Sequence, residues 1–148
     1  MRKAIISIVI ILYVLILVSC TDDLEIGDVL EGELATYPGV SMSIDRRAYP
    51  TAVTVIITNN SDSDISVWNE TDCGVEIEID DEWYSLVSKD VATPGIHTGY
   101  EKGSSTSVVM NWSARYGALP AGHYRVIKAF HLPDEHDDYA MAAEFTLE

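Results

Sequence analysis

The chain has 148 residues with 24 acidic and 9 basic (Lys and Arg) side chains, so its formal net charge is −15. Hydrophobic residues make up 47% of the sequence, which is typical of a globular domain and excludes an intrinsically disordered chain. The acidity argues against nucleic-acid binding, because neutralising phosphates requires clustered Lys and Arg, and two cysteines are too few for a disulfide scaffold.

The first nineteen residues predict an export signal. Met1-Arg2-Lys3 is a basic start, and the run from Ala4 to Val18 carries no charge. A basic start, a short apolar segment and a small residue are typical of a secretory signal. The apolar run falls short of the roughly 20 residues that span a bilayer comfortably, although an uncleaved membrane anchor is the alternative. Both interpretations place the rest of the chain outside the cytoplasm.

The end of this segment resembles the lipobox of bacterial lipoproteins. Leu17-Val18-Ser19 is followed directly by Cys20. The resemblance implies a diacylglycerol thioether on Cys20 and cleavage before it, with residues 1–19 removed. The mature chain would then hold seven basic and 24 acidic side chains and carry a net charge of −17. The N-terminal lipid would attach the mature chain to the membrane, which is therefore one predicted partner.

Residues 20–38 are predicted to form an acidic tether. Six acidic and no basic residues lie between Thr21 and Pro38. Like charges repel one another and extend a chain, so this segment would hold the following domain off the membrane. The alternative is that Leu24–Leu34 forms a short first strand or helix.

From Val40 onward, apolar residues alternate with polar ones, which predicts strands with one buried and one solvent-facing side. The predicted strands are Val40–Ile44, Val53–Thr58, Ile65–Asn69, Val75–Asp80, Trp83–Val87, Ser105–Trp112, Tyr124–His131 and Met141–Leu147. Polar, Gly and Pro residues separate them. We therefore expect residues 39–148 to form a monomeric all-β domain, an antiparallel β-sandwich of about seven to eight strands.

The stretch Leu119-Pro-Ala-Gly122-His-Tyr124 opens a late strand. This pattern resembles the tyrosine corner of immunoglobulin-like sandwiches, in which the Tyr hydroxyl bonds backwards to main chain. Leu119, Gly122 and Tyr124 are its predicted residues, and Gly122 is expected to supply a backbone angle that other residues resist. A generic turn before an ordinary strand is the alternative.

The order of the GVSMSI, TAVTVIITNNSDSD, DDEWYSLV and YGALPAGHYRVIKAF segments resembles bacterial immunoglobulin-like domains of lipid-anchored envelope proteins in Gram-positive bacteria. The resemblance covers about residues 38–148. It implies an Ig-like sandwich, an envelope role and no catalytic residues. No cysteine pair is present to join the two sheets, so the core must hold without that bond.

In an Ig-like sandwich the B–C and F–G loops lie at the same end. Here they bring together an acidic tip that consists of Asp62, Asp64, Asp134, Glu135, His136, Asp137 and Asp138. Packed like charges destabilise one another unless something cationic neutralises them. We therefore expect the tip to meet a cation such as Ca²⁺, or a basic envelope protein. The spacing matches no metal motif, and a solvated acidic loop is the alternative.

No other residues indicate a cofactor or a catalytic site. The sequence contains no GxSxG, SxxK, P-loop or GxGxxG pattern. Cys73 lies beside acids that would raise its pKa, and we expect a small buried residue, with intermolecular pairing as the alternative. At least one of Trp68, Trp83 and Trp112 is expected in the core.

The sequence thus predicts a lipid-anchored extracytoplasmic module with a non-catalytic binding or structural role. The alternative is an inhibitor or accessory subunit of a secreted or envelope enzyme. An inhibitor would present a protruding loop, and Val87–Ser105 is the longest candidate.

Overall fold

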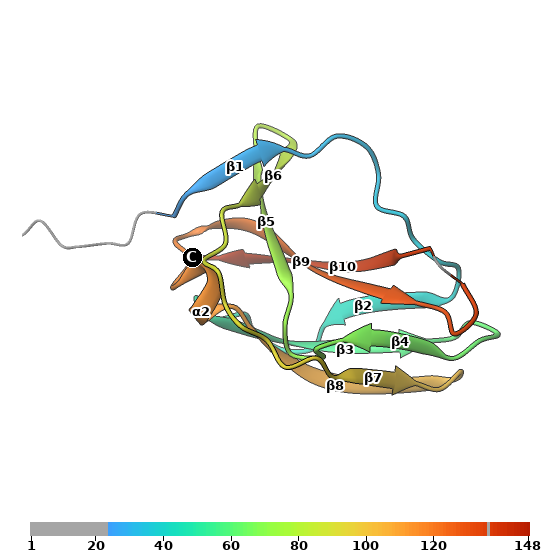
Figure 1. The fold of residues 1–148 in the computed structure, drawn as a ribbon. Helices are drawn as coiled ribbons and strands as arrows, with labels where there is room; N and C mark the ends of the chain where they lie inside the picture. Colours follow the sequence, from blue (N-terminus) through green and yellow to red (C-terminus); the bar gives the residue numbers. More distant parts are fainter. Residues whose placement is uncertain (1–23, 136) are drawn as a thin grey trace, which may run out of the picture.

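The alternating segments form two antiparallel sheets that face each other in the computed structural model, which describes residues 24–135 and 137–148 (Figure 1). The strands are β1 (Ile26–Val29), β2 (Val40–Ile44), β3 (Ala52–Asn59), β4 (Ile65–Trp68), β5 (Gly74–Ile79), β6 (Glu82–Leu86), β7 (His97–Tyr100), β8 (Ser104–Asn111), β9 (Gly122–His131) and β10 (Tyr139–Leu147), with one short helix, α2 (Ser113–Tyr116). The smaller sheet has the order β2-β3-β8. The predicted all-β sandwich is confirmed.

Strand β9 is the centre of the larger sheet. It pairs with β10 along its whole length on one side. Its other side is shared, because β5 pairs with residues 124–127 and β4 with residues 130–131. The chain leaves the sheet at residues 69–73, between β4 and β5. From there β5 leads to β6 and β1, while β4 leads to β7, so the sheet spreads in two directions from β9 (Figure 1).

The core lies between the two sheets and is built by the predicted alternation. In β3, Val53, Val55 and Ile57 are buried while the residues between them are partly exposed. Trp112 stacks on Phe145 at a ring distance of 5.4 Å. Each fully buried side chain of this size contributes about 1.5–3 kcal/mol, so the sandwich needs no bond between cysteines.

The sequence did not predict three elements, the strands β1 and β7 and the helix α2. β7 has the sequence HTGY, which lacks an alternating apolar pattern, and α2 is only four residues long. β1 lies inside the predicted tether and pairs with β6, so residues 26–29 are not part of a free tether. The structure instead has the alternative, a short first strand within Leu24–Leu34. Pairing with β6 outweighs the acidic composition there.

Candidate functional site

The Tyr124 side chain closes a turn at the start of β9. It is fully buried, and its hydroxyl donates a hydrogen bond to the Pro120 carbonyl oxygen at 2.9 Å. Leu119 is also buried, and its backbone N–H donates to the Pro50 carbonyl oxygen at 2.9 Å. A Tyr hydroxyl that bonds backwards to main chain near the start of a late strand is the geometry of a tyrosine corner.

Gly122 has a different role from the predicted one. Its φ is not in the positive range that favours glycine, so the expected special backbone angle is wrong. The constraint is space, because a Cβ atom at this position would lie 3.0 Å from Cε2 of Tyr124 and 3.2 Å from its hydroxyl oxygen. Glycine lets the Tyr124 ring pack against the backbone two residues earlier.

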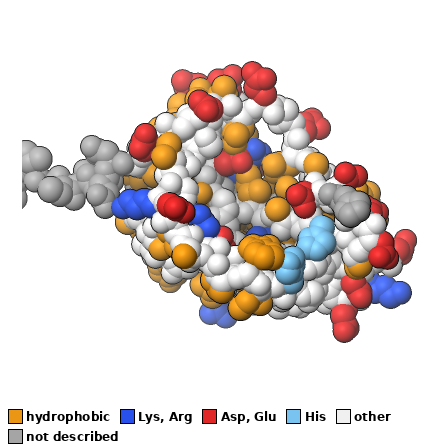
Figure 2. Space-filling model, in the orientation of Figure 1, with side chains coloured by type: hydrophobic (Ala, Val, Ile, Leu, Met, Phe, Trp, Pro, Cys, Tyr) orange, Lys and Arg blue, Asp and Glu red, His pale blue; other side chains and the backbone are white. Residues whose placement is uncertain are grey.

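The two loops of the predicted acidic tip lie at the same end of the sandwich. Ser66, just after the β3–β4 loop, pairs with His131, just before the β9–β10 loop. In Figure 2, acidic side chains gather at the right-hand end of the view, where these loops lie in Figure 1. Asp64 accepts a hydrogen bond from the Lys102 backbone N–H at 2.9 Å.

The described residues of the tip do not form a recognisable metal centre. Within residues 24–135 and 137–148, no group of three or more His, Cys, Asp and Glu side chains could hold a metal ion. Glu135 accepts a hydrogen bond from the Tyr139 hydroxyl at 2.9 Å, and His136 lies outside the described residues. Calcium binding therefore stays a prediction without a ligand cluster in this part of the chain.

The structure describes one of the two cysteines. Cys20 lies outside the described residues. Cys73 is buried, and burial together with the neighbouring Asp72 carboxylate raises its thiol pKa to about 12. A thiol with so high a pKa is almost entirely protonated at neutral pH and is a poor nucleophile. The expectation of a small, buried, unreactive residue agrees with this environment.

The three tryptophans occupy different environments. Trp112 is the core residue, and its indole N–H donates to the Pro50 carbonyl oxygen at 2.8 Å. Trp68 is half exposed on the outer face of the larger sheet, edge-to-face with His97 at 4.4 Å. Trp83 is partly buried, and the Arg125 guanidinium lies 4.3 Å above its ring.

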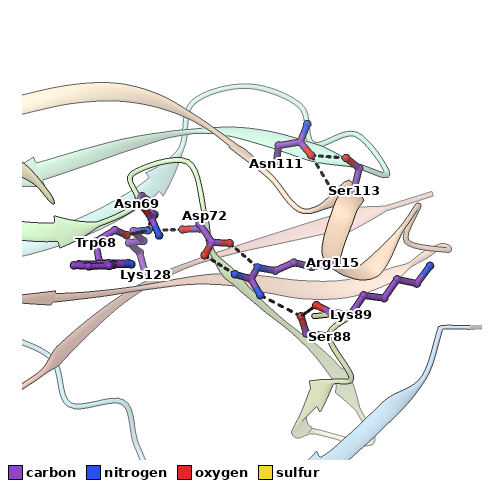
Figure 3. A network of polar contacts seen from close by, with 9 residues as sticks. All are labelled: Trp68, Asn69, Asp72, Ser88, Lys89, Asn111, Ser113, Arg115 and Lys128. Carbon is purple, nitrogen blue, oxygen red and sulfur yellow. Dashed lines mark hydrogen bonds and ion pairs between the residues drawn. The ribbon is translucent and has the colours of Figure 1, made fainter. Parts of the chain in front are cut away.

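A buried lysine that sequence reasoning missed holds together the break between β4 and β5 (Figure 3). Lys128 on β9 is only 5% exposed. Its ammonium donates to the carbonyl oxygens of Trp68 (2.6 Å), Asn69 (2.5 Å) and Asp72. Burial lowers the pKa of Lys128, while nearby acids including Asp72 raise it. A buried ammonium needs several acceptors, and the end of β4 together with the following loop supplies three of them.

An ion pair extends this network to the end of the domain. Arg115 of α2 makes two hydrogen bonds to the Asp72 carboxylate, at 2.6 and 2.7 Å, and a third to the Ser88 hydroxyl at 3.3 Å (Figure 3). This hydrogen bonding to Asp72 raises the pKa of Arg115. The helix, the 69–72 loop and the chain after β6 are thereby joined. The only sequence signal was a lysine at a position where β9 alternation predicts an apolar residue.

The segment proposed as an inhibitory loop does not stand free. Residues 87–105 contain β7, and the stretch before β7 is held near both of its ends by backbone hydrogen bonds. The Lys89 N–H donates to the Arg115 carbonyl oxygen at 2.9 Å, and the Asn69 N–H donates to that of Ile96 at 2.7 Å. The segment runs along the side of the sandwich (Figure 1), so it lacks the protrusion expected of an inhibitor.

The two facing sheets, with the Tyr124 turn at the start of β9, identify the fold, and a family described as a bacterial Ig-like domain matches residues 36–146. The chain belongs to this bacterial Ig-like domain family. The prediction of a bacterial Ig-like domain with an Ig-like sandwich is confirmed. No curated protein and no solved structure matches the chain.

Membership in this family indicates the general character of the domain. Ig-like domains of this kind are generally non-catalytic and typically extracellular. Among residues 24–135 and 137–148, no helix has the length and apolar character needed to cross a membrane.

Proposed function

We propose that this protein is a lipid-anchored, extracytoplasmic Ig-like module with a non-catalytic binding or structural role at the cell envelope. The observation that carries the proposal is the lipobox-like Leu17-Val18-Ser19-Cys20, which lies shortly before an Ig-like domain that begins near residue 36. Two acyl chains on Cys20 would hold the protein firmly, because each buried CH₂ contributes about 0.8 kcal/mol.

The arrangement of the domain supports a defined orientation on the membrane. Leu24 lies beside Lys89, Arg115 and Tyr116, at the end of the sandwich that carries α2. The acidic tip lies at the opposite end (Figure 1). An anchor at Cys20 would therefore leave the acidic tip pointing away from the membrane.

The tether is short in this arrangement. Because β1 begins at Ile26, only the residues from Cys20 to Glu25 remain as a connection. They can reach at most about 20 Å. The domain would therefore stay close to the bilayer, with its far end available to other envelope components.

Mass spectrometry of the membrane fraction tests the proposal. We expect a mature chain that begins at a lipid-modified Cys20. In a Cys20→Ser variant we expect loss of the lipid and accumulation of an uncleaved precursor, while Cys73→Ser, which keeps the lipobox, is expected to be processed normally. A mature chain without lipid on Cys20, or wild-type protein in the cytosol, would contradict the proposal.

A further inference from the structure

Two adjoining cavities form a groove along the side of the sandwich that carries the turn between β7 and β8. Their volumes are about 250 Å³ and 290 Å³. Glu70 and Thr98 line both cavities, so the two form one continuous surface, which we call the lateral groove. The first cavity lies over the 69–72 loop, and the second over the turn between β7 and β8.

Two residues that line the lateral groove each carry a buried side-chain atom that lacks a hydrogen-bond partner. These are Asn69 Nδ2 and Ser104 Oγ, the two such side-chain atoms in the described part of the chain. Asn69 lines the first cavity and Ser104 the second. Asn69 is 6% exposed, and its Oδ1 already accepts the Ile96 N–H at 3.3 Å, so the amide orientation is fixed. An unpaired buried donor is unfavourable, and an acceptor on a ligand that reached it would relieve this cost.

The lining of the lateral groove is acidic. It includes Glu70, Asp72 and Glu101, and no Lys or Arg lines either cavity. Arg115 pairs with Asp72, and the buried Lys128 ammonium interacts with Glu70 through space. One Glu70 oxygen accepts the Tyr100 hydroxyl, which holds the side chain in the groove. The strongly negative domain adds a field that attracts cations and repels anions.

The backbone beside the lateral groove is open to an additional strand. β7 is the last strand in the order of the larger sheet, and β8 is at the edge of the smaller one. An edge strand presents unpaired N–H and C=O groups, which an extended peptide can bind. Peptide groups also supply the carbonyl acceptors and amide donors that Asn69 and Ser104 lack.

We propose that the lateral groove binds an extended, lysine- or arginine-bearing segment of a partner protein. The basic side chain pairs with Glu70, and the peptide backbone lies along β7 and contacts Asn69 and Ser104. This inference rests on the proposed binding role but not on the lipid anchor.

Titration calorimetry of the full-length protein in detergent micelles tests it. The probe is a blocked hexapeptide of alternating Lys and Thr, compared with the Glu and Thr peptide and with chitotetraose. We expect only the Lys peptide to bind, with an affinity that falls as salt is raised. Binding of the glycan alone, or of no probe, would overturn the proposal while leaving the anchor test unaffected.

A pair of charge-matched variants separates the groove from the overall charge. Glu70→Gln removes one negative charge from the groove, and Asp62→Asn removes one from an exposed loop. A hydrogen bond to a charged group is worth at least about 1.5 kcal/mol, so Glu70→Gln is expected to weaken binding about tenfold. Asp62→Asn should stay within twofold, and equal losses in both variants would refute the groove.

Hydrogen exchange on the wild-type protein supplies a readout that needs no variant, in case Glu70→Gln fails to fold. The Lys peptide is expected to slow amide exchange in residues 97–104 and to leave residues 60–64 unchanged. Protection at the acidic tip instead would overturn the assignment to the lateral groove.

Discussion

Replacing Lys128 with methionine tests whether the buried ammonium holds the β4–β5 break together. Methionine is similar in length and apolar, so the space stays filled. The three carbonyl oxygens of Trp68, Asn69 and Asp72 lose their shared donor. The Asn69 carbonyl oxygen still accepts a hydrogen bond from the Asp72 N–H at 2.8 Å. The carbonyls of Trp68 and Asp72 therefore lose the most.

The expected cost follows from these two carbonyls. Each unpaired buried acceptor costs about 1–3 kcal/mol, and removing the desolvation penalty of the ammonium offsets part of this. We expect Lys128→Met to lower the free energy of unfolding by about 3 kcal/mol. Lys128→Arg should not restore it, because a planar guanidinium cannot place three donors around one point.

Urea unfolding followed by tryptophan fluorescence measures the effect. Lys102→Met is the matched control, because Lys102 is exposed and its substitution should change stability by less than about 0.5 kcal/mol. If Lys128→Met is as stable as this control, the apolar side chain compensates fully. The three hydrogen bonds would then make no net contribution to stability.

Four further outcomes are expected. Tyr124→Phe removes the bond to the Pro120 carbonyl and should cost about 1–2 kcal/mol in urea unfolding, with no change in fold by circular dichroism. Gly122→Ala should cost about 1–3 kcal/mol in the same assay, because the added methyl displaces the Tyr124 ring; wild-type stability would refute this. The Cys73 thiol, with its pKa raised to about 12, should resist thiol reagents at pH 8 until the protein unfolds. In the unfolded chain this thiol ionises at a lower pH, so its contribution to the free energy of unfolding should be lost as the pH rises from 9 towards 12. If the acidic tip binds calcium as the sequence predicts, the melting midpoint should rise with calcium concentration, and an unchanged midpoint would contradict calcium binding.

The strands of the sandwich could be predicted from local sequence. An alternation such as that of β3 has one dominant solution, because only a strand places Val53, Val55 and Ile57 on the same face. The order of Leu119, Gly122 and Tyr124 likewise indicated a turn, although the physical role of the glycine was misjudged. Contact between its backbone and a side chain two residues away depends on the ring orientation, which spacing does not give.

Only the tertiary structure decided which distant segments pair with one another. β1 became a strand because β6 lies beside it, and nothing in its own acidic sequence required this. Lys128 breaks the apolar pattern of β9 because three carbonyls from a loop about sixty residues earlier surround its ammonium. The lateral groove brings the loop after β4 together with β7 and the start of β8, which lie about thirty residues further along the chain. Sequence periodicity records which face of a strand is buried, whereas such contacts depend on which strands become neighbours.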